Sequence, residues 1–192
     1  LLVPVGGDGA IGVARACQCV QAALADACGT GLLGERLRPF CRWLEGYDLS
    51  AGMLGEAEAK GLYDRLGKRD IGALEIVGAP FDLIVAADVF AYLGALERVV
   101  AWCAGMLVPG GRFAFTVEQG TEGVTLRESQ RFAHGRDYIE DILQEAGFGA
   151  IRIADCVVRM DRGAPVASLC VVADLSSTTR DAGEEERAVL LA

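Results

Sequence analysis

The sequence is poor in the residues that build metal sites and in the long apolar runs that cross membranes. It contains one histidine, His134, and no CxxC pair among its seven cysteines. A zinc site made of Cys and His ligands is therefore not expected. No apolar run approaches the roughly 20 residues that span a bilayer, and the first residues lack the basic and apolar regions of a signal peptide. These absences predict a cytoplasmic protein whose cysteines are free thiols packed as small hydrophobes.

Positive charge is also scarce. The chain has 18 Lys and Arg against 27 Asp and Glu, which gives a formal net charge of −9. Such a surface repels nucleic-acid backbones and anionic membranes, so neither is expected as the main partner. The 192 residues, 52% of them hydrophobic, are typical of one folded domain. We expect a domain over 1–175 that begins with a helical segment over 1–23, and a largely solvated tail over 176–192. The first residue is not Met, which suggests a piece of a longer protein.

Apolar runs alternate with amphipathic stretches along the chain. The clearest strand is "FDLIVAAD" at 81–88, whose nearly unbroken apolar run is typical of a central parallel strand. The pattern predicts further strands just before Gly29 and over 42–48, 68–70, 112–118, 150–160 and 164–175. Helices are expected over 13–24, 32–40, 50–61, 95–107 and 135–148. This order predicts an α/β fold: a doubly wound, mostly parallel sheet with an antiparallel C-terminal strand formed by a final hairpin.

Glycines and acids follow several of these predicted strands. In open α/β sheets, ligands bind beyond the carboxyl ends of the central strands, where we expect Gly29–Gly31, Asp48, Asp70 and Asp88 to converge. The glycines would let the backbone approach a ligand, and the Asp48 carboxylate would accept both hydroxyls of a ribose. Asp70 would accept from an adenine amino group. The alternatives remain a flexible glycine corner and acids that only stabilise helix N-termini.

Five segments in this order resemble class I S-adenosylmethionine-dependent methyltransferases: "ACGTGLLGERLRP", "GYDLSAGML", "GLYDRLGKRDI", "FDLIVAADVFAYLG" and "LVPGGRFAFTVE". With "RFAHGRDYIEDILQEAGF", the chain resembles the methyltransferase domain of bacterial predicted methyltransferases that often carry an N-terminal tetratricopeptide (TPR) region. It is also similar to the Williams–Beuren-region methyltransferase-like proteins. The resemblance covers roughly 24–174. It implies a seven-stranded Rossmann-like sheet, S-adenosylmethionine as cofactor with S-adenosylhomocysteine as product, and a small-molecule acceptor. It also implies a possible TPR region in a longer parent chain.

The resemblance also implies a set of cofactor-binding residues. These are Cys28, Gly29, Thr30, Gly31, Asp48, Leu49, Met53, Asp70, Ile71, Asp88, Val89 and Phe90. One departure concerns the first motif, since Asp26-Ala27-Cys28-Gly29 is one residue shorter than the family's acid-x-Gly-x-Gly pattern and has alanine in place of its first glycine. This departure keeps open the alternative of a catalytically silent, cofactor-binding scaffold or sensor.

Catalytic residues are harder to assign, because methyl transfer is an in-line displacement with a neutral leaving group. It depends mainly on alignment and needs a general base only when the acceptor is protonated. The candidates on the acceptor side are His134, Tyr92 and Glu118, with a structural loop histidine as the alternative for His134. Arg131 and Tyr138 are candidates for orienting an acceptor or, alternatively, ordinary surface residues. The run "GTGLLG" at 29–34 also matches a dinucleotide fingerprint, which leaves a nicotinamide-dependent oxidoreductase as a third hypothesis.

Overall fold

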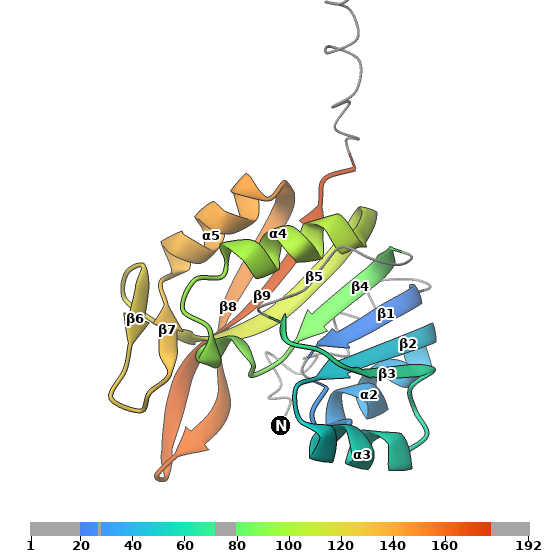
Figure 1. Ribbon diagram of the computed structural model, residues 1–192. Coiled ribbons are helices and arrows are strands. Elements are labelled where there is room, and N and C mark those ends of the chain that lie inside the picture. Colours follow the sequence, from blue (N-terminus) through green and yellow to red (C-terminus); the bar gives the residue numbers. More distant parts are fainter. Residues whose placement is uncertain (1–19, 27, 72–79, 178–192) are drawn as a thin grey trace, which may run out of the picture.

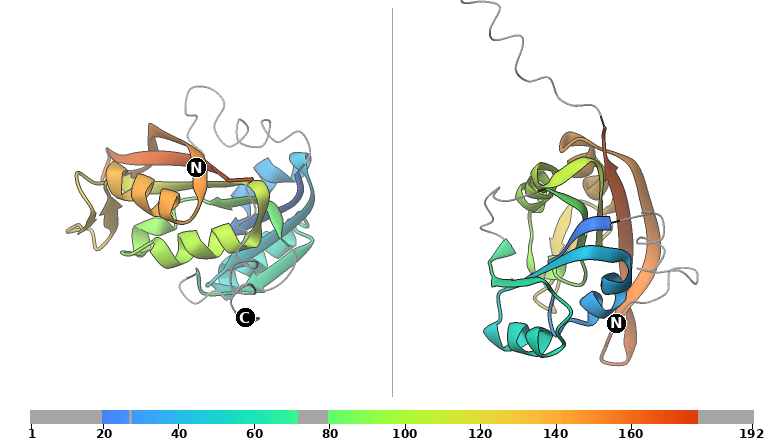
Figure 2. Two further views of the ribbon diagram at one scale, coloured as in Figure 1. Left: turned by 90° about the horizontal axis from the view of Figure 1, so that it is seen from above. Right: turned by 90° about the vertical axis from the view of Figure 1, so that its right-hand side faces the viewer.

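The computed structural model describes residues 20–26, 28–71 and 80–177. They form one twisted sheet with helices on both faces (Figures 1 and 2). The strands are β1 (Val20–Asp26), β2 (Cys41–Asp48), β3 (Arg65–Lys68), β4 (Phe81–Ala86), β5 (Leu107–Gln119), β6 (Val124–Leu126), β7 (Phe132–His134), β8 (Phe148–Asp161) and β9 (Ala164–Leu175). The helices are α2 (Leu32–Leu37), α3 (Ala51–Ala59), α4 (Glu97–Met106) and α5 (Arg136–Glu145), with short 3-10 turns at η1 (Arg38–Phe40) and η3 (Phe90–Tyr92).

The sheet separates two apolar cores, and β4 contributes to both. Its side chains alternate, so Ile84 packs into the larger core beneath α4 and α5, whereas Leu83 and Val85 pack into the smaller core with α2 and α3. A strand covered on both faces needs apolar residues on each face, which explains the nearly unbroken apolar run, with Asp82 as the exception. Figure 2 shows α4 and α5 together on one face and α2 on the other.

The strand order confirms the predicted α/β class. Strands β3-β2-β1-β4-β5 are parallel neighbours, while β9 pairs antiparallel with β5 and β8 with β9. The predicted final hairpin is present, and its turn residues Arg162 and Gly163 both have positive φ, at 47° and 83°. Two consecutive positive φ values suit the tight turns that join twisted antiparallel strands.

The described sheet has nine strands instead of the predicted seven. The additional pair is the β6–β7 hairpin, whose second strand extends the edge of β5 at Glu118 and Gln119. Without this hairpin, seven strands remain in the order β3-β2-β1-β4-β5-β9-β8. The hairpin was missed because its three-residue strands lie in a polar stretch without hydrophobic periodicity.

The helix predicted over 13–24 is wrong for its described part. Residues 20–26 form β1, and 13–19 lie outside the described residues, as does most of the helical segment expected over 1–23. The run "VQAALAD" has good helix formers, but β1 lies between β2 and β4 and pairs with both in parallel. The hydrogen bonds of a central strand position outweigh the weak local preference for helix.

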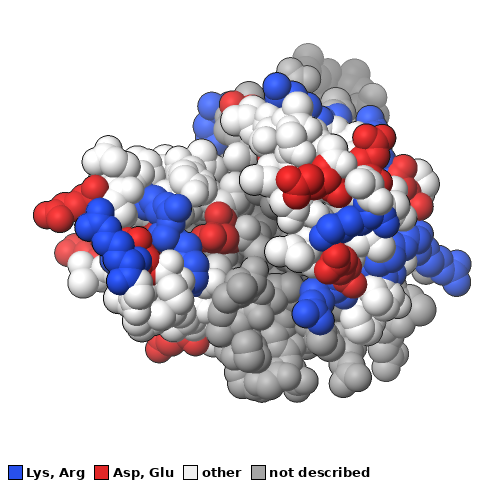
Figure 3. Space-filling view, turned by 90° about the horizontal axis from the view of Figure 1, so that it is seen from below, with Lys and Arg blue, Asp and Glu red and all other residues white. Residues whose placement is uncertain are grey.

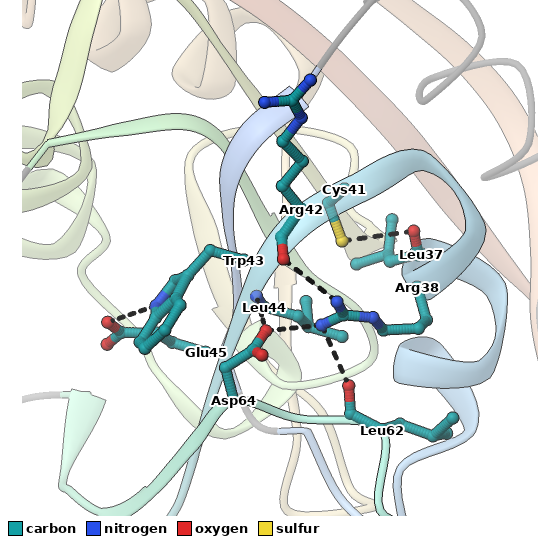
Figure 4. Close-up of polar contacts among 9 residues, drawn as sticks. All are labelled: Leu37, Arg38, Cys41, Arg42, Trp43, Leu44, Glu45, Leu62 and Asp64. Carbon is teal, nitrogen blue, oxygen red and sulfur yellow. Dashed lines mark hydrogen bonds and ion pairs between the residues drawn. The ribbon is translucent and has the colours of Figure 1, made fainter.

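The strand predicted over 68–70 is displaced, since β3 covers Arg65–Lys68 and Asp70 follows it. Figure 4 shows the polar contacts that set this register. The Asp64 carboxylate accepts the backbone N–H of Leu44 over 2.8 Å and a guanidinium N–H of Arg38 over 2.5 Å. The same guanidinium donates to the carbonyl of Arg42 over 3.0 Å. These bonds fix the start of β3 beside β2.

Candidate cofactor and acceptor site

The segments that carry the predicted site leave the sheet at one edge. Asp26 at the end of β1 is in register with Tyr47 of β2 and with Ala86 of β4. All three strands are parallel, so the loops that follow them emerge together, as Figure 1 shows at the arrowheads of β1, β2 and β4. The glycine turn, Asp48 and Asp88 therefore share one rim, as the sequence predicted.

Asp48 joins the glycine turn to the start of α3. One carboxylate oxygen accepts the backbone N–H of Gly29 over 2.9 Å, and the other accepts that of Ser50 over 2.8 Å. Ser50 is the N-cap of α3 and accepts the N–H of Met53 over 3.3 Å, so Asp48 is not the helix cap. The carboxylate is thus held in a fixed orientation at the edge of the sheet.

The glycine turn itself requires glycine for its backbone. Gly29 and Gly31 have φ of +53° and +83°, a region that L side chains rarely adopt. The backbone N–H of Cys28 donates to the carbonyl of Tyr47 over 2.9 Å, and its side chain is buried in the smaller core. Thr30 is half-buried. A Cβ at Gly29 would meet nothing within 4 Å, so one side of the turn is open.

Gly34, which completes the dinucleotide-like run, has a packing role. A Cβ there would lie 2.5 Å from the ring of Tyr63, so glycine is needed for helix α2 to approach this tyrosine. Burial is the main cause that raises the pKa of the Tyr63 phenol. Close packing of the helix is also the role of the third glycine in a dinucleotide fingerprint, so this contact does not distinguish a nicotinamide site from another cofactor site.

Next to Asp48 the rim carries exposed apolar side chains. Leu49 is 62% exposed and Met53, in the first turn of α3, is 43% exposed. Asp70 is exposed beyond β3, and Ile71 is half-buried against the larger core. The predicted contacts of these four residues with a cofactor remain predictions.

Asp88 follows β4 in an unusual backbone conformation. Its φ is +55°, which is rare for a residue other than glycine, and its N–H donates to the Thr116 hydroxyl over 2.9 Å. Such strained residues are concentrated at functional sites. Burial raises the pKa of its carboxyl, Glu118 adds to this, and Arg131 opposes it.

The two residues after Asp88 turn toward the interior. Val89 packs against the larger core, and Phe90 is fully buried with its ring 5.3 Å from that of Phe115 and 6.3 Å from that of Phe113. The Phe90 side chain therefore packs in the core, and its predicted contact with the cofactor remains a prediction. An apolar ring at the start of η3 gains more from the core than from the rim.

His134, a candidate on the acceptor side, lies in β7. Its side chain is fully buried, and Nε2 lies 2.9 Å from the carbonyl oxygen of Gly94. Burial lowers the pKa of the imidazole, although contacts with backbone carbonyls oppose this. Its ring stacks on Tyr138, whose hydroxyl accepts the N–H of Leu96 at the start of α4. The predicted roles of His134 and Tyr138 toward an acceptor remain predictions.

The two remaining candidates differ in exposure. Tyr92 is 60% exposed, and its hydroxyl accepts an N–H of Arg131 over 3.1 Å while the guanidinium lies 5.3 Å from the ring centre. Glu118, at the end of β5, is 4% exposed and forms ion pairs with Arg159 and Arg127. Arg159 also lies 3.7 Å from Asp88.

The sequence did not predict a role for Arg127 or Arg159. Arg127 follows the short β6 strand and Arg159 is far along β8, so no local motif connects them to the rim. Strand pairing brings them together: β8 pairs with β9, which pairs with β5. Figure 3, seen from below, shows Lys and Arg side chains lying among Asp and Glu side chains on this side of the molecule.

A family model described as "Methyltransferase domain" matches residues 26–113. The malonyl-[acyl-carrier protein] O-methyltransferase of Enterobacter lignolyticus is 32% identical over 104 residues. That match covers 54% of this chain and 41% of the enzyme, so the chain spans less than half of its relative's length. The matched region contains the glycine turn, Asp48 and Asp88.

Solved structures match over more of the chain. N-methyltransferase NodS from Bradyrhizobium japonicum WM9, in complex with S-adenosylhomocysteine, superposes with a TM-score of 0.69 and 22% identity over 86% of this chain and 83% of its own. The magnesium protoporphyrin IX methyltransferase of Synechocystis PCC 6803 superposes with a TM-score of 0.67 and 20% sequence identity. That match covers 87% of this chain and 80% of the methyltransferase. The chain has the fold of S-adenosylmethionine-dependent methyltransferases. Within the described residues, no helix is long and apolar enough to cross a membrane, and no group of three His, Cys, Asp or Glu residues is placed to hold a metal.

Proposed function

We propose that this chain transfers a methyl group from S-adenosylmethionine to a small-molecule acceptor, and that the cofactor binds across the glycine turn and Asp48. The observation that carries the proposal is the Asp48 carboxylate, which is fixed by Gly29 and Ser50 at the carboxyl ends of the parallel strands. A solved structure with the same fold, NodS, is a complex with S-adenosylhomocysteine, which supports this cofactor. The methyltransferase family model and the curated relative support the same activity.

The residues at this edge fit such a cofactor. A carboxylate offers about four lone-pair sites, and two of those on Asp48 are used by backbone N–H groups. The other two are left for the hydroxyls of a ribose. The open side of Gly29 leaves room beside the turn, and exposed Leu49 and Met53 supply an apolar surface for an adenine. Asp70 lies farther along, where an adenine amino group would donate.

The bound cofactor supplies a methyl group on a positively charged sulfur. The role of the chain is to hold the acceptor in line with that group, since alignment alone supplies much of the rate in such a displacement. Asp88, with its strained backbone, and partly exposed Tyr92 border the acceptor side. Buried His134 takes no part in proton transfer. We also propose that the protein is cytoplasmic and that its parent chain carries a TPR region.

The second candidate is a domain that binds the cofactor without catalysis, which the shortened motif at Asp26-Ala27-Cys28 favours. The experiment is incubation of the chain with S-adenosylmethionine labelled in its methyl group and a panel of amines, phenols, thiols and carboxylic acids. The proposal predicts labelled product and S-adenosylhomocysteine with at least one acceptor class. Cofactor binding without product across the panel would support the silent domain, and absence of cofactor binding would refute both.

A further inference from the structure

A groove lies between the carboxyl end of β5 and the tip of the β8–β9 hairpin. It encloses about 300 Å³, which is the size of a site for a small molecule. One wall is the hairpin segment 164–167, which is Ala-Pro-Val-Ala. The other carries polar residues, namely Glu118, Arg127, Ser129 and Arg159, with exposed Asp161 at the hairpin tip. The groove thus joins a short apolar wall to a pair of guanidinium groups.

Glu118 forms ion pairs with both guanidinium groups. Its carboxylate is 4% exposed, forms an ion pair with Arg159 and lies 3.7 Å from Nε of Arg127. Arg127 is fixed further by donating to the carbonyl of Gln119 over 2.6 Å. Arg159 also forms an ion pair with Asp88, so Glu118 and Asp88 together balance the two positive charges. What the groove offers a ligand is therefore guanidinium N–H donors and not a net positive charge. Asp161 is exposed, so solvent screens its charge from the inner part of the groove.

The two arginines also have more donors than Glu118 can accept from. Each guanidinium carries five N–H groups, whereas a carboxylate has about four acceptor sites. Nε of Arg159 is buried without a hydrogen-bond partner, and the Asp88 carboxylate lies 3.7 Å from it. Buried donors are normally satisfied, so this N–H marks a position for an acceptor atom of a ligand. Two guanidinium groups facing one groove match the paired oxygens of a carboxylate.

The groove opens toward the methyl-transfer region. Arg159 contacts Glu118 at the end of β5 and approaches Asp88 after β4, and these strands are neighbours in the sheet. A molecule whose anionic end lies on the arginines would therefore extend along the rim toward Asp88. The apolar wall of the hairpin would pack against the part between its two ends.

We propose that this groove binds a carboxylate group of the methyl acceptor, with Arg127 and Arg159 as the residues that bind it. The term acceptor rests on the proposed function, whereas carboxylate binding by the groove does not. The volume limits the bound part to a short chain or a single ring. The acceptor is therefore a small carboxylic acid, anchored by its charge at a point remote from the glycine turn.

The test is calorimetric titration of the chain with propionate, succinate and benzoate, each compared with its neutral amide, in the presence and absence of S-adenosylhomocysteine. At least one acid is expected to bind about tenfold or more tightly than its amide. Arg127→Met and Arg159→Met are each expected to weaken that acid about tenfold or more, while the amide is unaffected. Arg98→Met, which removes an exposed arginine from α4, is the matched control and leaves binding unchanged.

Arg159→Lys guards against a folding defect, because lysine keeps the charge beside Glu118 but lacks the planar fork. It is expected to fold normally and to bind the acid more weakly than the unchanged chain. Equal binding of acids and amides, or acid binding that survives both methionine variants, would overturn the proposal. Acid binding without any binding of S-adenosylhomocysteine would support the groove and refute the proposed function, so the two failures are distinguishable.

Discussion

Replacement of Asp48 by Asn separates the two roles assigned to this carboxylate. The amide oxygen still accepts one backbone N–H, but the NH₂ group opposes the other N–H, from either Gly29 or Ser50. Loss of one hydrogen bond to a charged group costs about 1.5–3 kcal/mol. Asp48 is partly exposed, so we expect about 1 kcal/mol in the free energy of unfolding, or a fall in Tm of about 2–4 °C.

The same change removes the charged acceptor for the ribose hydroxyls. A loss of about 2 kcal/mol corresponds to roughly thirtyfold weaker binding of S-adenosylhomocysteine. Calorimetric titration measures this affinity, and urea denaturation measures the stability. Asp141→Asn, at an exposed position of α5, makes the same change in charge away from the site and is expected to leave the affinity unchanged. An affinity of Asp48→Asn equal to that of the control would refute the role of Asp48.

Three further predictions concern packing, protonation and pH. Gly34→Ala forces a Cβ against the ring of Tyr63, so we expect the free energy of unfolding, measured by urea denaturation, to fall by about 1–2 kcal/mol. In a chain that already carries Tyr63→Leu, which makes room, Gly34→Ala is expected to cause no further loss. His134→Gln is expected to change kcat/KM by less than about threefold, whereas removal of a general base would cost about a hundredfold or more. The hydrogen bond from Arg112, 2.5 Å long, holds the pKa of Asp174 below its usual value. The contribution of this ion pair to stability is present at neutral pH and is lost as the pH falls through that lowered pKa. The difference in unfolding free energy between the unchanged chain and Asp174→Asn is therefore expected to shrink below about pH 4. A difference independent of pH would contradict this.

The sequence predicted the central part of the fold well. The strand β4 lies within the predicted 81–88, and α4 and α5 lie within 95–107 and 135–148. Buried strands and amphipathic helices carry strong hydrophobic patterns, which explains this agreement. The sequence also placed the glycine turn and Asp48 together correctly, because parallel strands bring their carboxyl ends to one edge of the sheet.

What the sequence did not predict depends on contacts between distant segments. The start of β3 is set by Asp64 against Leu44 and Arg38, and β1 is a strand because of its two neighbours. The burial of His134 follows from its place in β7, a three-residue strand too short to show a pattern. The arginine pair of the groove comes from β8 and from the segment after β6, which no spacing in the sequence relates.

The most direct test of the central claim is a crystal structure of the chain with S-adenosylhomocysteine. We expect the ligand beside the glycine turn, with both ribose hydroxyls at hydrogen-bond distance, about 2.5–3.0 Å, from the Asp48 carboxylate and the sulfur directed toward Asp88. A ligand bound elsewhere on the chain, or a ribose that makes no contact with Asp48, would contradict the account.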